Sequence, residues 1–250
     1  MIVCEIGQNH IGSMDLARTL IDLSKRGSAD LCKFQLYDHD KLYKDTNIPN
    51  VELTFNQAKE LFDYGKSIDM EVFFSVFDVE KVKWCEEIGV KRYKLANSMT
   101  DVQEYDYKPN CKMPFVVSKE SRERSKKNLS VIDAIGKTKK PTIASNARHL
   151  CLYYPQILLC VSNYPATIID YDFYNHCFCH EWGCDKEHYN GISDHTIGLD
   201  ASKIALARGA EIIEKHFCLN HDTGIDAPWS MTYGDLIELK RWHDLCASVL

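Results

Sequence analysis

Short apolar segments alternate with amphipathic ones along almost the whole of the 250-residue chain. The apolar segments have the length of strands, and we expect strands at residues 2–6, 30–35, 71–76, 91–96, 114–118, 157–161, 191–195 and 211–216. Between them, apolar residues recur at helical spacing, which predicts helices over 14–26, 54–68, 78–88, 199–208 and 233–247. Strands that alternate with helices are typical of parallel βαβ units.

Eight such strands predict a closed (β/α)₈ TIM barrel, an α/β fold whose usual length is about 250 residues. An open, doubly wound sheet is the alternative that shows the same alternation. No linker rich in Pro, Gly or Ser divides the chain, so we expect a single domain over residues 1–250. Residues 137–156 lack a clear period and are expected to form an irregular insertion, whereas the basic stretch 118–127 should begin a solvated helix.

Charge and composition exclude some classes of partner. A net charge of −6 and a pI near 5.9 provide no general attraction to nucleic acid or to an anionic membrane. No apolar run approaches the roughly 18 residues of a membrane span, and the N-terminus does not resemble a signal peptide. The 11 cysteines, several of them in predicted core strands, are therefore expected to be reduced thiols of a cytoplasmic protein.

Polar residues occur near the carboxyl ends of the predicted strands, on the face that would point into a barrel. Because side chains alternate along a strand, Glu5 shares its face with Val3. The same parity sends inward Lys33, Gln35, Lys94, Ser193, His195, Glu214 and His216. Burying one unpaired polar group costs on the order of 1–3 kcal/mol, and the carboxyl ends of barrel strands form the active-site mouth. Such a set predicts a ligand site.

The residue types favour a metal-assisted enzyme that binds an anionic phosphate compound. His195 and His216 end adjacent strands and suit a partly open metal site, for which imidazole favours Zn, Mn, Fe or Co. Lys33 and Lys94 supply donors to a phosphate or carboxylate. Further donors, bases and orienting groups would be Ser118, Ser193, Glu5 and Glu214. Taken singly, each residue also has a structural explanation, as half of an ion pair or as a core histidine.

Short motifs at these strand ends resemble the N-acetylneuraminate (sialic acid) synthase family, which includes the legionaminate and pseudaminate synthases. In chain order they are EIGQNHIGSMDLA, KFQLY, KLANS, CVSNYPA, GISDHTIGLDA and EIIEKHF. The resemblance runs from residue 2 to about residue 240 and implies a (β/α)₈ barrel. It also implies that phosphoenolpyruvate adds through C3 to the aldehyde of an open-chain N-acylated hexosamine. Water then attacks C2 and phosphate leaves, which yields a nine-carbon 2-keto-3-deoxy acid.

The resemblance also implies roles for particular residues. His195 and His216 would hold a divalent ion, Mn²⁺ or Mg²⁺, which polarises the sugar aldehyde. The catalytic residues would be Glu5, a candidate general acid and base, the phosphoenolpyruvate-binding Lys33 and Lys94, and Glu214. The substrates would be contacted by Gln35, Asn97, Ser118, Tyr164, Ser193 and Asp226. The default acceptor is N-acetylmannosamine, and a diacetylated, bacillosamine-derived sugar is the alternative.

The serine that follows strand five can be chosen in two ways. Both KMPFVVSK and KKPTIASN fit the family pattern of a Lys-Pro step, an apolar strand and a serine. Spacing from Lys94 favours Ser118, whereas local similarity slightly favours Ser145. We choose Ser118, because it leaves a full helix between strands five and six.

The chain departs from the family pattern at three places. Asn97, Ser98 and Met99 stand where the family usually carries Ser or Gly and then an acid, which puts the acceptor sugar in doubt. The chain begins at strand one, and it ends after the eighth helix. We therefore expect no C-terminal antifreeze-like domain, the part of the family that lends an arginine to the partner subunit's sugar site. A homodimer is expected by resemblance, but without exchange of that domain.

Two other functions stay open. Lys33 or Lys94 would form a Schiff base with a keto acid in an aldolase-type barrel enzyme, although such chemistry gives the two histidines no role. A non-catalytic binding relative of the synthases is the other alternative. The segment 176–188 is a local oddity that carries His176, Cys177, Cys179, His180, Cys184 and His188. Its spacing matches no usual zinc motif, and a cysteine-rich helix and loop is the simpler interpretation.

Overall fold

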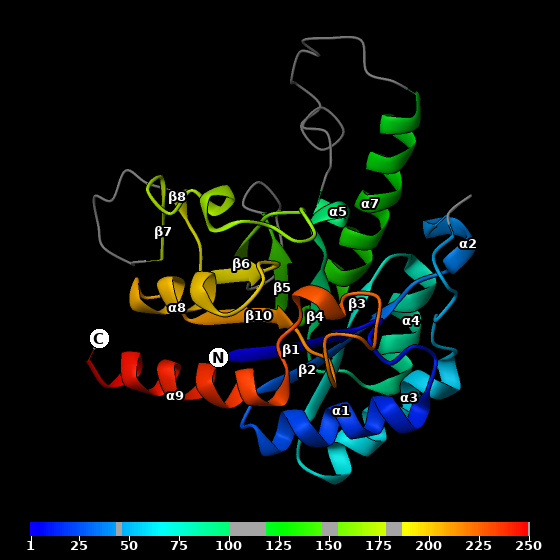
Figure 1. The fold of residues 1–250 in the computed structure, drawn as a ribbon. Helices are drawn as coiled ribbons and strands as arrows, with labels where there is room; N and C mark the ends of the chain where they lie inside the picture. The colour runs from blue at the N-terminus through cyan, green and yellow to red at the C-terminus, as the bar shows by residue number, and fades with distance from the viewer. Residues whose placement is uncertain (44–46, 101–118, 147–154, 179–186, 250) are drawn as a thin grey trace.

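The computed structural model describes residues 1–250 except 44–46, 101–118, 147–154, 179–186 and 250. Eight parallel strands form a closed barrel in the order β1-β10-β9-β6-β5-β4-β3-β2, with the helices packed around it (Figure 1). The barrel strands are β1 (Ile2–Gly7), β2 (Leu31–Leu36), β3 (Glu71–Val76), β4 (Tyr93–Leu95), β5 (Thr142–Ser145), β6 (Pro155–Cys160), β9 (Gly191–Asp194) and β10 (Ile212–His216). The (β/α)₈ barrel expected from the sequence is confirmed, and the open sheet is excluded.

The described helices include the five predicted from apolar spacing, with bounds that agree to within two residues, and others that this spacing did not predict. They are α1 (Met14–Arg26), α2 (His39–Leu42), α3 (Phe55–Ser67), α4 (Val79–Ile88), α5 (Asn97–Thr100), α7 (Lys119–Thr138), α8 (Asp200–Ala207) and α9 (Tyr233–Val249). Two short 3₁₀ helices, η1 (Ile168–Tyr171) and η2 (Ala227–Trp229), lie in the connections at the carboxyl ends of β6 and β10. The basic stretch at 118–127 does begin a helix, α7.

Local capping signals explain where several helices begin and end. The side chains of Ser13, Thr54 and Asp78 each accept a hydrogen bond from the backbone N–H three residues further on, at the starts of α1, α3 and α4. A cap of this kind stabilises a helix by about 1 kcal/mol. Gly89 ends α4 in a left-handed conformation, with φ of 90°. These local signals, which lie within a few residues of each boundary, fix where the helices begin and end.

The fifth strand of the barrel is β5, so the prediction that residues 114–118 form the fifth strand is wrong. β5 pairs with β4 on one side and with β6 on the other, and α7 precedes it. Residues 114–118 themselves lie outside the described residues. The predicted irregular insertion at 137–156 is also wrong where the structure describes it, because that range holds the end of α7, all of β5 and the start of β6.

The segment 176–188 is not the predicted helix and loop where the structure describes it. His176–Cys177 forms β7 and Glu187–His188 forms β8, and the two short strands pair in parallel. Cys179, His180 and Cys184 lie outside the described residues. Six cysteines within the described part of the chain are free thiols: Cys4, Cys32, Cys85, Cys160, Cys218 and Cys246.

The inside of the barrel has an apolar layer of its own. It consists of Val3, Leu31, Phe73, Ile143, Leu158 and Ile212, each from a different strand and at most 3% exposed. Two residues further along, each of these strands places a polar side chain or a cysteine on the same face, as strand alternation requires. The apolar layer therefore closes the barrel below a polar layer that faces the carboxyl ends of the strands.

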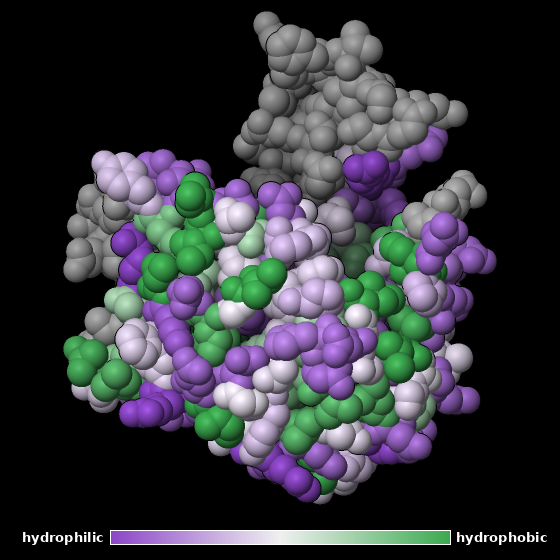
Figure 2. All heavy atoms as spheres, viewed as in Figure 1, coloured by the Kyte–Doolittle hydropathy of each residue, from purple (hydrophilic) through white to green (hydrophobic). Residues whose placement is uncertain are grey.

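The outer surface mixes residue types, with hydrophilic and hydrophobic residues interspersed over the face shown in Figure 2. Within the described ranges, the structure contains no helix that is both long enough and apolar enough to cross a membrane.

Candidate active site

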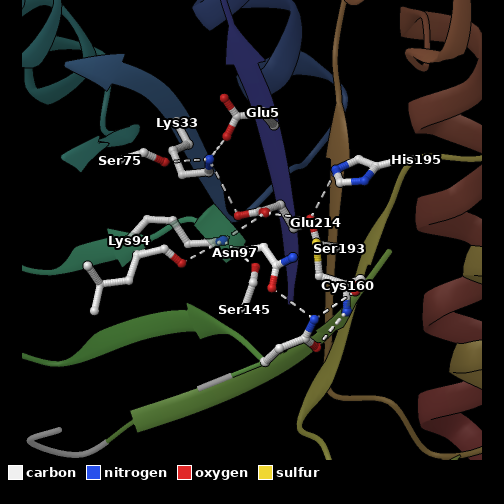
Figure 3. A network of polar contacts seen from close by, with 12 residues as sticks. Glu5, Lys33, Ser75, Lys94, Asn97, Ser145, Cys160, Ser193, His195 and Glu214 are labelled. Atoms are coloured by element: carbon white, nitrogen blue, oxygen red, sulfur yellow. Dashed lines mark hydrogen bonds and ion pairs between the residues drawn. The ribbon is translucent and has the colours of Figure 1, made fainter. Parts of the chain in front are cut away.

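Eight side chains, one from each barrel strand, form the floor of a cavity of about 470 Å³ at the carboxyl end of the barrel. We call this set the polar ring. In order around the barrel it consists of Glu5, Lys33, Ser75, Lys94, Ser145, Cys160, Ser193 and Glu214. All eight are buried, none more than 8% exposed. Figure 3 shows the two lysines and Glu214 pointing toward one another across this floor.

Glu214 bridges the two lysines of the polar ring. The Lys33 ammonium contacts the Glu5 carboxylate, donates to Ser75 Oγ at 2.9 Å and lies 3.6 Å from Glu214 Oε2. Lys94 Nζ donates to Ser145 Oγ at 2.8 Å and lies 3.3 Å from Glu214 Oε1. Each lysine is thus held by one serine hydroxyl and by at least one carboxylate, with its ammonium group facing the cavity.

Burial and charge shift the pKa values within the ring in a consistent way. Burial lowers the pKa of Lys33 to about 7, although the Glu214 carboxylate acts in the opposite direction. Burial alone would raise the pKa of Glu214, but the ammonium groups of Lys33 and Lys94 outweigh it and the pKa falls to about 2. Near neutral pH, Glu214 therefore stays ionised while Lys33 exchanges between its two protonation states.

The close approach of β9 and β10 places Ser193 beside Glu214. Gly191 permits this approach, because a Cβ atom there would lie 1.8 Å from the Ile212 carbonyl oxygen. The two strands pair with Ser193 opposite Glu214, and Ser193 Oγ donates to Glu214 Oε1 at 2.8 Å. The glycine that opens the GISDH motif therefore has a structural role in assembling the ring.

His195 and His216 stand above the ring, with imidazole centroids 5.5 Å apart. His195 Nδ1 lies 2.6 Å from the Val161 carbonyl oxygen, which can only accept, so Nδ1 carries the proton. The other nitrogen, Nε2, lies 3.4 Å from Ser193 Oγ, whose proton is donated to Glu214. Burial lowers the pKa of His195 to about 4 and that of His216 to about 3. Both imidazoles are neutral at pH 7, the form that binds metals.

The residues around the histidines fit a partly open site for a divalent cation. The His195 Nε2 lone pair receives no proton from Ser193, and the buried His216 Nδ1 has no hydrogen-bond partner, lying 3.4 Å from Asp226 Oδ2. Burial raises the pKa of Asp226 to about 6. The described cavity residues include three carboxylates and two ammonium groups, so an anionic ligand needs a further cation. Among the described residues, no group of three or more His, Cys, Asp or Glu side chains is arranged to hold a metal ion by itself.

The mouth of the cavity contains the other residues that the sequence assigned to the substrates. Gln35, Asn97, Tyr164 and Asp226 all line it. The Tyr164 ring lies 4.4 Å from the imidazole of His195, between centroids. The amide group of Asn97 donates to Ser162 Oγ at 2.8 Å, which orients it at the rim. The structure thus brings together all the predicted site residues except Ser118.

Ser118 lies outside the described residues, and Ser145 occupies the ring position that follows strand five. The choice of Ser118 for that position is wrong, because the fifth strand of the barrel is Thr142–Ser145. Two ring members, Ser75 and Cys160, were not predicted at all. The alternation of side chains along a strand could have predicted both, because Ser75 follows Phe73 by two residues and Cys160 follows Leu158 by two.

A closed barrel with a cavity lined by polar residues at the carboxyl ends of its strands has the architecture of a (β/α)₈-barrel enzyme. Residues 20–246 match the model of the NeuB family, and the chain belongs to that family.

Named relatives agree with this assignment. N,N'-diacetyllegionaminic acid synthase of Legionella pneumophila is 26% identical over 96% of this chain and 69% of its own length. Pseudaminic acid synthase of Campylobacter jejuni is 28% identical over 97% of this chain and 71% of its own length. The crystal structure of the N-acetylneuraminic acid synthetase from Leptospira borgpetersenii, in complex with citrate, superposes with a TM-score of 0.78 at 23% identity. That alignment covers 99% of this chain and 84% of the other, and it shows the same fold.

Proposed function

We propose that this protein condenses phosphoenolpyruvate with an N-acylated hexosamine, assisted by a divalent metal, to form a nine-carbon 2-keto-3-deoxy acid and phosphate. The observation that carries the proposal is the polar ring, whose two lysines face a cavity directly beneath two neutral imidazoles. Relatives named as legionaminic and pseudaminic acid synthases support the reaction class.

In this proposal the floor of the cavity binds phosphoenolpyruvate. Lys33 and Lys94 neutralise its phosphate and carboxylate, and the hydroxyls that already hold them, Ser75 and Ser145, add donors. Glu214 keeps both ammonium groups in place from between them. The lysines are pre-oriented before the substrate arrives, so little of the binding energy is used to order them.

The proposed chemistry forms one carbon–carbon bond and breaks one carbon–oxygen bond. C3 of phosphoenolpyruvate attacks the aldehyde carbon, and the aldehyde oxygen gains a proton. Water attacks C2 and loses one proton, and the C2–O bond then breaks so that phosphate leaves with its bridging oxygen. As the C2 hydroxyl becomes the keto group, its proton, the second of the water, passes to the departing phosphate. The first water proton balances the one that the aldehyde oxygen gains, and Glu5, which is buried in the ring in contact with Lys33, would transfer it.

The residues above the ring would orient the acceptor. His195 and His216 would hold a divalent ion, Mn²⁺ or Mg²⁺, which supplies Lewis-acid polarisation of the sugar aldehyde when bound. Gln35, Asn97, Tyr164 and Asp226 at the mouth would contact the sugar. N-acetylmannosamine is the first acceptor to test, and a 2,4-diacetamido sugar the second.

The test measures phosphate release with phosphoenolpyruvate, Mn²⁺ and a panel of N-acylated hexosamines. Release should require all three components, and ¹⁸O placed in the bridging C2–O bond should appear in inorganic phosphate. The Lys33→Met variant should lose the activity, whereas Lys25→Met, a change on the outer surface, should keep it. Binding of phosphoenolpyruvate without phosphate release across the whole panel would indicate a binding protein. Label retained in the sugar acid would contradict C–O cleavage.

One observation favours a second candidate, a Schiff-base aldolase. The pKa of Lys33 near 7 leaves part of the population as a free amine, as a Schiff base requires. Reduction with borohydride in the presence of pyruvate should leave Lys33 unmodified if the synthase proposal is right. A reduced adduct on Lys33, found by mass spectrometry, would replace the proposal with the aldolase.

A further inference from the structure

The connection between β6 and β9 surrounds His195 on several sides. The Val161 carbonyl oxygen accepts from the imidazole, and the Ala166 N–H donates to the His195 carbonyl oxygen at 3.0 Å. The His195 N–H donates to the hydroxyl of Tyr171 at 2.9 Å. The Tyr164 ring lies against the imidazole. One segment, residues 161–171, therefore determines both the backbone position and the side-chain direction of His195.

The Tyr171 hydroxyl accepts a backbone N–H that has no partner within the sheet. β9 ends at Asp194, so the His195 N–H lies beyond the strand, and a buried N–H without a partner costs about 1–3 kcal/mol. The Tyr171 hydroxyl accepts this N–H and donates its own proton to the Ser193 carbonyl oxygen at 2.7 Å. A single hydroxyl thus joins the backbone of a polar-ring residue to that of His195.

Tyr171 is itself held rigidly and away from the cavity. Its side chain is fully buried, and its ring stacks on Phe173 with centroids 5.9 Å apart. Burial raises the pKa of the phenol, so the hydroxyl keeps its proton and serves as donor and acceptor together. Tyr171 does not belong to the described residues that line the cavity, so it acts on the site only through His195 and Ser193.

We propose that Tyr171 is a positioning residue for His195. Its hydroxyl holds the His195 backbone where the imidazole keeps Nδ1–H on the Val161 carbonyl and turns Nε2 into the cavity. This proposal rests on the proposed function in one respect, namely that His195 Nε2 binds a metal ion. If Tyr171 merely supported the fold, its hydroxyl would contribute to stability and leave the imidazole unchanged.

The test compares Tyr171→Phe with Tyr93→Phe in the full-length chain. Tyr93 is also fully buried, and its hydroxyl donates to Glu86 Oε1 at 2.6 Å, on the outer side of the barrel. Both variants should lower the melting temperature by about 2–4 °C for a loss near 1 kcal/mol. Only Tyr171→Phe should raise the Kd for Mn²⁺, by about tenfold, as loss of a group that orients a metal ligand does. Calorimetry with Mn²⁺ alone measures this constant.

A second readout needs no metal. The ¹⁵N signals of the His195 imidazole, assigned with His195→Gln, should report one tautomer with Nδ1 protonated in wild type and in Tyr93→Phe. Tyr171→Phe should show a mixture of tautomers, and an unchanged tautomer would overturn the inference. If wild type binds no Mn²⁺, the proposed metal role fails, while the tautomer still decides on Tyr171. If Tyr171→Phe does not fold, 3-fluorotyrosine at position 171 should shift the imidazole signals, and unshifted signals would overturn it.

Discussion

Strands β9 and β10 carry two buried clusters of charge on opposite faces, one inside the barrel and one outside. The inner cluster is the part of the polar ring around Glu214. The outer cluster is Asp194 with Lys215, neighbours in the paired strands and both fully buried against α8. The sequence alternation that sends Ser193 and Glu214 inward sends these two residues outward. The two clusters are thus alike in burial and residue types, and they face different surroundings.

The outer cluster is saturated and the inner one is not. Asp194 Oδ1 accepts from the backbone and the hydroxyl of Thr196, both at 2.8 Å, and Oδ2 accepts from Ser202. Lys215 Nζ lies 3.2 Å from Asp194 Oδ2 and donates to the Thr196 carbonyl oxygen. In the inner cluster, Glu214 Oε2 has no hydrogen-bond partner and opens on a cavity. The comparison shows that unfilled hydrogen-bonding capacity beside a cavity, rather than buried charge alone, marks the site for a ligand.

The largest effect should come from removing the inner cations. Lys33→Met combined with Lys94→Met should lower kcat for phosphate release by at least about 10³-fold, because each lysine donates to developing negative charge. The free energy of unfolding should also fall, because Glu5 and Glu214 would be buried without a counter-charge, so the rate is compared per folded molecule. Steady-state kinetics and urea denaturation measure the two quantities. A large loss of stability with modest loss of rate would make the inner cluster structural, like the outer one.

Breaking the outer pair should lower the stability of the fold and leave the rate of phosphate release unchanged. Asp194→Asn leaves Lys215 buried without a counter-charge and should lower the free energy of unfolding by about 3 kcal/mol. The phosphate release rate per folded molecule should stay near that of wild type. Asp194→Leu with Lys215→Met removes both charges and should recover most of the lost stability. Denaturant titration of the three proteins tests the prediction, and a double variant as unstable as Asp194→Asn would contradict it.

A smaller effect is expected from a single hydroxyl of the ring. Ser145→Ala removes one of the partners of Lys94 and should raise the KM for phosphoenolpyruvate about tenfold, the value of one charge-assisted hydrogen bond. Ser24→Ala is the matched control, because Ser24 is also fully buried but bonds the Leu20 carbonyl oxygen outside the barrel. Initial-rate measurements with both variants decide whether position 145 belongs to the phosphoenolpyruvate site. Equal KM values would remove Ser145 from it.

A further effect concerns the pH dependence of stability. Burial lowers the pKa of Lys33 from 10.5 to about 7, so between these values the unfolded chain binds more protons than the folded one. The contribution of Lys33 to stability therefore rises with pH across that window. Lys33→Met should remove this rise, so the stability difference between wild type and variant should shift in favour of wild type from pH 7 to pH 9. Urea titrations at the two pH values measure it, and a constant difference would mean that Lys33 titrates normally.

Alternation along the strands made most of the inner face predictable. Once the barrel was inferred, the positions of Glu5, Lys33 and Glu214 followed from the side-chain period of two. Ser75 and Cys160 follow the same rule, yet a small hydroxyl and a thiol within apolar segments look like core residues. The charged residues were therefore predicted from their type, whereas Ser75 and Cys160 could have been predicted only from their position along the strand.

The fifth strand could not be chosen from local pattern. KMPFVVS and KKPTIAS present the same order of residue types, and only pairing of Thr142–Ser145 with β4 and β6 distinguishes them. That pairing is a non-local property, because it joins segments that are far apart in the chain. Tyr171 is a similar case, because its hydroxyl contacts a histidine 24 residues away in the chain, across a connection with no period of its own.

The apolar layer formed by Val3, Phe73, Ile212 and their neighbours seals the cavity from below. Molecules can therefore enter and depart only through the mouth, and what lies on the floor is confined by what lies above it. In the proposed reaction, phosphoenolpyruvate must arrive before the sugar, and phosphate generated on the floor must wait for the sugar acid to depart. Because the lower end of the barrel is closed, substrates should bind and products should leave in a compulsory order, which steady-state kinetics would show.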